Sequence, residues 1–187
     1  MRKEVSNLLV VCGSCQNVGK TTLVKSIIET VSKNHEIVAI KVSPHKHNSD
    51  IEEQIFWQSE NCIIYLENQI SKKDSSQFLQ AGANPVFYIE TDDSKLELAF
   101  EKILNQIGND KLIICESGAL TRFFKPRILI YIESEEHLNT PNSKKNNNKG
   151  IADLVILTQS DTLDVNILEI KNKITVTDGK WELKNSK

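Results

Sequence analysis

The sequence predicts one α/β domain over residues 1–187, with a mostly parallel sheet and a small C-terminal β-hairpin. Short apolar runs alternate with helical stretches along the chain, which is the pattern of strand–helix–strand units in parallel sheets. The first apolar run, Leu8–Cys12, has no polar position, as expected of a central strand that is covered on both faces. Near the C-terminus, Asp178-Gly179 is a favoured two-residue turn and predicts a hairpin over 174–183.

Helical periodicity follows the first strand. Lys20–Ser32 carries apolar residues three and four positions apart, which predicts an amphipathic helix. Gly82 and Gly108 mark the expected ends of two more helices, because glycine commonly terminates a helix. Asn48–Ser59 is polar with apolar residues at helical spacing, which predicts a short helix or a lid. The further helices are expected at Asp74–Ala81, Asp93–Ile107 and Thr162–Ile170.

The remaining strands of the sheet are predicted from short runs of β-branched and other apolar residues. Ser43-Pro44 ends the first of these runs, because proline cannot continue a central strand. The strands are expected at Glu36–Val42, Cys62–Leu66, Pro85–Ile89, Lys111–Cys115, Arg127–Ile132 and Leu154–Leu157.

One segment breaks the alternation of strands and helices. Asn139–Gly150, with the sequence NTPNSKKNNNKG, contains almost no apolar residue. Such composition predicts a mobile surface loop, and a basic lid or a partner-binding loop is the alternative.

Composition limits the function classes that the chain can belong to. Its formal net charge is -2, which gives no electrostatic reason to expect binding to nucleic acid or to an anionic membrane. No apolar run is long enough to span a bilayer, and the first one is too short for a signal peptide. The 4 cysteines are too few for a disulfide scaffold and fit a reducing compartment. We therefore expect a cytoplasmic protein.

A loop rich in small residues joins the first strand to the first helix. Phosphate binding at a helix N-terminus needs converging backbone N–H groups, a lysine that reaches the outer phosphates and a hydroxyl for Mg²⁺. The end of the loop supplies these groups, although Ser14 stands where the usual spacing has glycine. We therefore predict a P-loop NTPase, a three-layer fold, that binds a nucleoside triphosphate and Mg²⁺. The predicted nucleotide-binding residues are Gly13, Ser14, Cys15, Gln16, Asn17, Val18, Gly19, Lys20, Thr21 and Thr22.

The sequence of this region has two other interpretations. Gly19-Lys20-Thr21 at a helix start can arise by coincidence. Cys12 and Cys15 form a CxxC pair, which occurs in redox and zinc sites. No second CxxC completes a zinc site, so we interpret one cysteine as the end of a buried strand and the other as a loop residue.

An acidic residue ends the apolar strand predicted over Lys111–Cys115. In P-loop proteins, a carboxylate at the end of such a strand organises Mg²⁺. We therefore predict that Glu116 binds the metal together with Thr21, and that Glu116 and Lys20 are catalytic. The alternative is a solvated glutamate at an ordinary strand-end turn.

A basic turn with histidines follows the strand Glu36–Val42. Ligands of open α/β sheets bind at the carboxyl ends of the strands, where this turn emerges. We predict that Lys41, His45 and Lys46 meet an anionic substrate. A metal shared by His45 and His47 is one alternative, and a solvated loop is another.

The segment Thr158-Gln159-Ser160-Asp161 bears on the choice of base. Guanine-binding proteins end a late strand with Asn or Thr, then Lys, any residue and Asp, whose carboxylate accepts hydrogen bonds from guanine. Here Gln159 replaces the lysine. Asp161 is therefore a candidate guanine-binding residue, with helix capping as its alternative role. GTP is the expected nucleotide, and ATP is the alternative.

Several of these features together resemble the molybdopterin-guanine dinucleotide biosynthesis protein B (MobB) family. They are the strand–GKTT–helix opening, Ile40-Lys41 with His45 and His47, and Asp74-Ser75 followed by Ala81-Gly82-Ala83. Glu116-Ser117-Gly118 stands where that family has an acidic turn, and the similarity covers roughly Leu8 to Ala119. The resemblance implies a GTP-binding adapter with weak GTPase activity, often a homodimer, that assists a nucleotidyltransferase in molybdenum cofactor biosynthesis. It also implies that Asp74 binds substrate.

A second resemblance leads to a different class of function. Gly13-Ser14, the Gly19-Lys20-Thr21 end and Glu116-Ser117-Gly118-Ala119 also look like dethiobiotin synthetase. That resemblance implies an ATP-dependent small-molecule ligase or kinase, which activates a carboxylate as an acyl phosphate. An interaction module without turnover is the third possibility.

Overall fold

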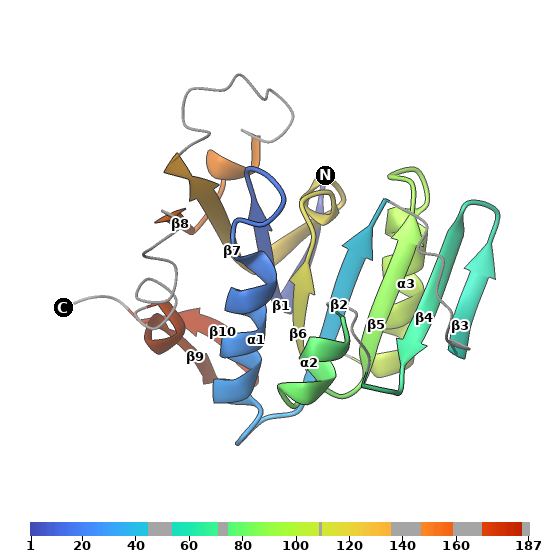
Figure 1. Cartoon of the computed structure of the whole chain (residues 1–187), viewed down its shortest axis with the longest axis horizontal. Coiled ribbons are helices and arrows are strands. Elements are labelled where there is room, and N and C mark those ends of the chain that lie inside the picture. Colours follow the sequence, from blue (N-terminus) through green and yellow to red (C-terminus); the bar gives the residue numbers. More distant parts are fainter. Residues whose placement is uncertain (45–53, 71–74, 109, 136–146, 159–169, 185–187) are drawn as a thin grey trace.

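The fold was derived from a computed structural model that describes residues 1–44, 54–70, 75–108, 110–135, 147–158 and 170–184 (Figure 1). An 8-stranded sheet has the order β3-β4-β5-β2-β6-β1-β7-β8. Its strands are β1 (Lys3–Gly13), β2 (Ile37–Ser43), β3 (Gln54–Ser59), β4 (Cys62–Glu67), β5 (Val86–Thr91), β6 (Leu112–Glu116), β7 (Phe124–Ser134) and β8 (Leu154–Thr158). The β3–β4 and β4–β5 pairs are antiparallel and the other pairs are parallel, so the predicted mostly parallel sheet is confirmed.

Helices pack on both faces of the sheet, as Figure 1 shows. Helices α1 (Lys20–Val31) and α2 (Ser76–Gln80) lie on one face, and α3 (Leu96–Ile107) lies on the other. The apolar positions predicted for the first helix are its buried positions, and they join one hydrophobic cluster on that face. A second cluster fills the space beneath α3. Central strands such as β6 are buried at every position because both of their faces are covered.

The predicted C-terminal hairpin is also confirmed. Strands β9 (Ile174–Thr177) and β10 (Lys180–Leu183) pair antiparallel around Asp178 and Gly179, whose φ angles are 49° and 70°. The Trp181 side chain is fully buried in the α1-side core, and its Nε1 donates to the Ile113 carbonyl at 3.0 Å. The hairpin therefore completes the core beside the lower end of α1 (Figure 1).

The structure corrects the prediction made for Asn48–Ser59. Its described part is strand β3, which pairs antiparallel with β4, rather than a helix or a lid. Asn61 makes the tight turn between the two strands with a left-handed φ of 60°. Pairing with β4 outweighed the weak helical spacing because each strand residue at a sheet edge gains backbone hydrogen bonds. Residues 48–53 lie outside the described part of the chain.

Part of the segment Asn139–Gly150, for which a mobile loop is predicted, lies within the described residues. Residues 147–149 form a helical turn that is hydrogen-bonded to the body of the protein, so this end of the segment has regular secondary structure. Residues 139–146 lie outside the described residues, as does nearly all of the predicted helix Thr162–Ile170.

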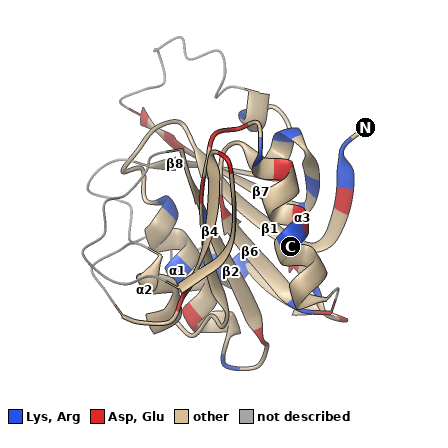
Figure 2. Ribbon diagram, turned by 90° about the vertical axis from the view of Figure 1, so that its right-hand side faces the viewer, with Lys and Arg blue, Asp and Glu red and all other residues tan. Residues whose placement is uncertain are grey.

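Charges of both signs occur along the described part of the chain. Acidic and basic residues alternate along the coloured ribbon in the view of Figure 2. None of the helices in the described ranges is long and apolar enough to cross a membrane.

Candidate functional site

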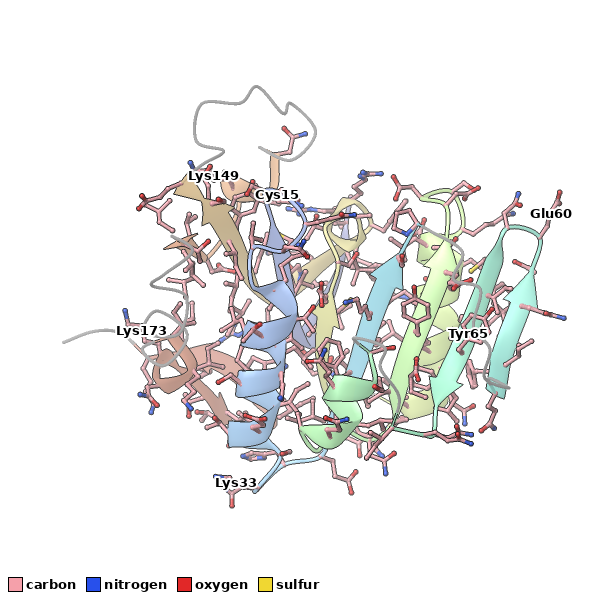
Figure 3. The ribbon with its side chains drawn as sticks, in the orientation of Figure 1. Cys15, Lys33, Glu60, Tyr65, Lys149 and Lys173 are labelled. Carbon is pink, nitrogen blue, oxygen red and sulfur yellow. The ribbon has the colours of Figure 1, made fainter. Side chains whose placement is uncertain are left out.

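The candidate site lies at the carboxyl ends of three neighbouring strands, β2, β6 and β1. The strand register pairs Glu116 with Val11 on one side and with Lys41 on the other. The loop after β1 leads into α1 at the same edge. Figure 3 shows Cys15 of this loop at the upper edge of the sheet and Lys33 beyond the far end of α1. The residues predicted from separate motifs are therefore brought together by parallel pairing.

The β1–α1 loop begins with a close approach to β7. A Cβ atom on Gly13 would lie 2.8 Å from the Ile132 carbonyl oxygen and 2.8 Å from Val18 Cγ2. Such contacts are too short for any side chain, so this position requires glycine. The next amide, of Ser14, donates to the same Ile132 carbonyl at 2.9 Å. The loop is thus fixed to the end of β7 where it begins.

Ser14, the departure from the usual glycine spacing, has a structural role. Its hydroxyl oxygen accepts a hydrogen bond from the Ser134 amide at 3.2 Å. This contact ties the loop to the last residue of β7. The motif spacing gave no sign of Ser134, because the partner lies 120 residues away in the sequence.

The loop turns into α1 through two residues in the left-handed region. Asn17 has a φ of 59° and Gly19 a φ of 88°. Val18 between them is buried in the core, and Gly19 accepts the first helical hydrogen bond, from Leu23. This geometry leaves the backbone N–H groups at the start of α1 without helical partners, and a helix N-terminus of this kind favours anions.

Thr21, Glu116 and Lys41 meet directly beside the loop. The Thr21 hydroxyl donates to Glu116 Oε2 at 2.8 Å. Lys41 Nζ lies 3.4 Å from the same oxygen and 3.3 Å from Thr21 Oγ1. The side chains of Lys41 and Glu116 are only 14% and 9% exposed, so this is a largely buried ion pair. The structure thus brings these three predicted site residues into contact.

Lys20 folds back over its own loop. Its ammonium group donates to the Cys15 carbonyl at 2.6 Å. The side chain spans the loop, so its charge stands next to the N-terminus of α1. This is the region that an anion bound by the loop would occupy.

The two cysteines of the CxxC pair have different environments. Cys12 is buried in β1, and burial raises the pKa of its thiol to about 12. Cys15 is half-buried in the loop, and both residues are free thiols. Their placement confirms the interpretation as a strand end and a loop residue.

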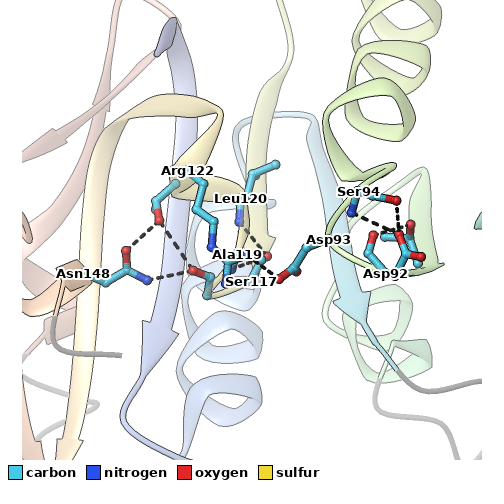
Figure 4. Close-up of polar contacts among 11 residues, drawn as sticks. Asp92, Asp93, Ser94, Ser117, Ala119, Leu120, Arg122 and Asn148 are labelled. Carbon is cyan, nitrogen blue, oxygen red and sulfur yellow. Dashed lines mark hydrogen bonds and ion pairs between the residues drawn. The ribbon is translucent and has the colours of Figure 1, made fainter. Parts of the chain in front are cut away.

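The loop after β6 holds Glu116 in place. The Ser117 amide donates to the Val11 carbonyl at 3.1 Å, which extends the β1–β6 pairing by one residue. Ser117 Oγ accepts hydrogen bonds from the amides of Ala119 and Leu120, at 3.3 and 3.2 Å. At the end of η1 (Leu120–Arg122), Arg122 pairs with Asp93 of the β5–α3 connection (Figure 4).

Mg²⁺ suits the donors that the site presents. It prefers oxygen ligands and is commonly held by one or two side chains together with phosphate oxygens and water. The Thr21 hydroxyl and the Glu116 carboxylate are such ligands and lie within 2.8 Å of one another. Among the described residues, no group of 3 or more His, Cys, Asp or Glu side chains forms a separate metal-binding cluster.

Of the other predicted site residues, Gln16 in the loop and Thr22 in the first turn of α1 are exposed. His45, Lys46, His47, Asp74 and Asp161 lie outside the described residues. Sequence reasoning missed three further contributors, Ser134, Thr121 and Asn148, each of which bonds a loop of the site. These polar residues lie in no recognisable motif, and only the fold brings them to the site.

Comparisons of the chain with protein-family models, with curated proteins and with solved structures gave no match.

Proposed function

We propose that the chain is a P-loop protein that binds a nucleoside triphosphate with Mg²⁺ and hydrolyses it slowly. The observation that carries the proposal is the 2.8 Å contact between Thr21 Oγ1, in the first turn of α1, and Glu116 Oε2, at the end of β6. A hydroxyl after the loop lysine and a strand-end carboxylate are the two groups that hold Mg²⁺ beside the phosphates of a bound nucleotide.

Each residue has a distinct role in this proposal. The N–H groups of the β1–α1 loop bind phosphate oxygens, and Lys20 turns from the Cys15 carbonyl to the outer phosphates. Thr21 and Glu116 hold Mg²⁺, which when bound offsets the negative charge of the phosphates. Lys41 adds a fixed positive charge at the same point. The loop is positioned before the ligand arrives, because Gly13 and Ser14 fix it to β7.

The biological role proposed for this activity is that of the MobB family. The chain would act as a GTP-binding adapter, as a monomer or a homodimer, for a nucleotidyltransferase in molybdopterin-guanine dinucleotide biosynthesis. The motif resemblance between Leu8 and Ala119 supports this role. The sequence pattern at Thr158–Asp161 favours GTP as the nucleotide, and ATP is the alternative.

Native mass spectrometry with GTP, ATP and Mg²⁺ tests the proposal and reports the oligomeric state. The unchanged protein is expected to bind GTP, and Lys20→Ala is expected to lose it. Lys25→Ala is the matched control, because Lys25 lies on the same helix and pairs with Glu29 at the surface. Binding by Lys20→Ala equal to that of the control would contradict the site. ATP binding about tenfold tighter than GTP, a difference of about 1.4 kcal/mol, would contradict the GTP assignment.

A second candidate function is ATP-dependent activation of a small acceptor, as in a ligase or kinase. A cavity of about 260 Å³ favours it, because it lies at the same sheet edge next to β2. The register places Glu90 of the cavity opposite Ser43, two residues beyond Lys41. The lining residues are Pro44, Ser59, Asn61, Cys62, Ile63, Glu90, Thr91 and Asp92.

Formation of the nucleoside diphosphate distinguishes the two functions. A ligase or kinase is expected to form little ADP from ATP alone and more when a small carboxylate or alcohol is added. An adapter is expected to hydrolyse GTP slowly at a rate that such compounds leave unchanged. Glu90→Gln is expected to reduce the stimulation only if the cavity holds the acceptor.

A further inference from the structure

Asn148 lies in a polar stretch of sequence and contacts the loop that follows Glu116. It lies in the helical turn of residues 147–149, within the tract KKNNNK. Its Nδ2 donates to the Gly118 carbonyl at 2.8 Å, and its Oδ1 accepts from the Thr121 hydroxyl at 2.6 Å (Figure 4). One side-chain amide therefore bonds both ends of the turn from Gly118 to Thr121.

The peptide between Gly118 and Ala119 is held at both of its polar ends. Asn148 bonds its carbonyl, while Ser117 Oγ accepts a hydrogen bond from its N–H at 3.3 Å. Glycine is the residue with the greatest backbone freedom, so without these contacts Gly118 would be the weakest point of the loop. The two contacts offset this freedom.

The turn that carries Asn148 is itself anchored to β7. Lys149 Nζ lies 2.6 Å from the carboxylate of Glu133, which is buried near the end of that strand. A few residues later, Asp153 and Leu129 exchange two hydrogen bonds, at 2.9 Å from the Asp153 amide and 2.7 Å to its carboxylate. Asn148 thus connects the strand on one side of β1 with the loop on the other side.

We propose that Asn148 is a positioning residue for Glu116, with Thr121 as its partner. By fixing the Gly118–Ala119 peptide, it holds the strand-end carboxylate at the 2.8 Å contact with Thr21 without touching the nucleotide. The proposal rests on the function proposed above. A displacement of about 1 Å at a reacting group can cost about a hundredfold in rate, so loss of this contact should lower turnover.

Hydrogen exchange without nucleotide tests the first part of the proposal. Asn148→Ala is expected to speed exchange of the Ala119 and Leu120 amides about fivefold to tenfold, the effect of losing one net hydrogen bond of about 1 kcal/mol. Asn147→Ala is the matched control, because Asn147 is the exposed neighbour in the same turn. Exchange that is equal in the two variants would overturn the proposal.

Turnover kinetics with Mg²⁺ and GTP test the second part. Asn148→Ala is expected to lower kcat about tenfold and to leave the dissociation constant for GTP within about twofold, because the contact acts on positioning alone. Asn147→Ala is expected to keep both values. Thr121→Val, which removes the donor to Asn148 Oδ1 and a longer contact of 3.5 Å with the Gly118 carbonyl, should lower kcat less, and the double variant should be no slower than Asn148→Ala.

The outcomes separate this inference from the proposed function. An unchanged kcat in Asn148→Ala, with the protein folded and active, would overturn the positioning role and leave the nucleotide site intact. If Asn148→Ala fails to fold, Thr121→Val decides by the same two measurements. Failure of the unchanged protein to bind GTP or ATP would overturn the proposed function, and the positioning role with it.

Discussion

Glu116 is the residue on which most of the site depends. It accepts a hydrogen bond from Thr21 and pairs with Lys41 in a region where both charged side chains are at most 14% exposed. A buried ion pair of this kind contributes little net stability, but removing one partner leaves the other charge without an opposite charge to compensate it. The arrangement therefore constrains which substitutions the site can accept.

Glu116→Gln keeps the size of the side chain and removes its charge. We expect it to lower the free energy of unfolding by about 3 kcal/mol, because the substitution removes the negative charge that faces the Lys41 ammonium group in a poorly hydrated place. Nucleotide binding should persist while turnover falls. Urea unfolding and single-turnover hydrolysis measure the two effects. The double variant Lys41→Met/Glu116→Gln should recover part of the lost stability. If Glu116→Gln alone turned over as fast as the unchanged protein, the carboxylate would have no role in turnover.

Thiol labelling gives a second prediction at the residue scale. Burial raises the pKa values of the thiols of Cys12, Cys62 and Cys115, whereas Cys15 is half-buried in the loop. With Ellman's reagent at pH 8, we expect Cys15 to react first and all 4 thiols to react in urea. Saturating nucleotide and Mg²⁺ should slow the fast reaction. Fast labelling that persists in Cys15→Ser would contradict this assignment.

At the scale of elements, parallel strands explain why part of the site was predictable. The central strands and α1 have unbroken apolar patterns, and parallel pairing brings their carboxyl ends together, so Lys20, Thr21, Lys41 and Glu116 were found from the sequence. Strand β3 was missed because a solvent-facing edge strand has a weak pattern. Asn148 was missed because its partners lie 27 and 30 residues away and no local rule relates them.

Gly13→Ala tests the packing of the β1–α1 loop against β7. The new methyl group would meet the Ile132 carbonyl and Val18, each at 2.8 Å. We expect a loss of about 1–3 kcal/mol in the free energy of unfolding, together with weaker nucleotide binding, because the loop must shift. Gly150→Ala is the control, since the nearest atom would be 4.0 Å away. Equal stability of the two variants in urea would disprove the tight approach.

At the scale of the whole molecule, the C-terminal hairpin is part of the core. Trp181 is fully buried and bonds the Ile113 carbonyl, and the Arg127 side chain donates to the Trp181 carbonyl at 3.3 Å. The hairpin thus joins β10 to β6 and β7, strands that also build the site. Its stability and that of the sheet are expected to be coupled.

Trp181→Phe removes the indole N–H and part of the ring. We expect a loss of about 1–3 kcal/mol, because the variant gives up a buried hydrogen bond and some packing. Trp57→Phe is the control, since Trp57 is only half-buried on strand β3. The urea unfolding midpoints of the two variants are measured by circular dichroism. Equal midpoints for Trp181→Phe and Trp57→Phe would show that the hairpin is not part of the core.

Alkaline pH should weaken the whole fold. Burial raises the pKa of the Cys12 thiol from 9.0 to about 12 and that of the Tyr88 hydroxyl from 10.0 to about 12. The folded state therefore keeps protons that the unfolded state releases, so stability is full below pH 9 and falls as pH rises toward 12. Urea midpoints at pH 8, 9.5 and 10.5 measure the decline. Cys12→Ala should show a smaller decline, and an equal one would exclude this thiol as a cause.

The position of β1 in the sheet has a consequence for how the chain is made. This apolar strand is synthesised before both of its partners, β6 and β7, and the Thr21–Glu116 contact spans 95 residues. Strand β1 therefore lacks its strand partners until β6 and β7 have been synthesised. Sheets whose strands pair over long sequence separations fold slowly, and their apolar, aggregation-prone strands stay exposed in the meantime. Nascent chains stalled before β6 are expected to associate with chaperones, and a nucleotide can rescue only chains that already contain β6 and β7.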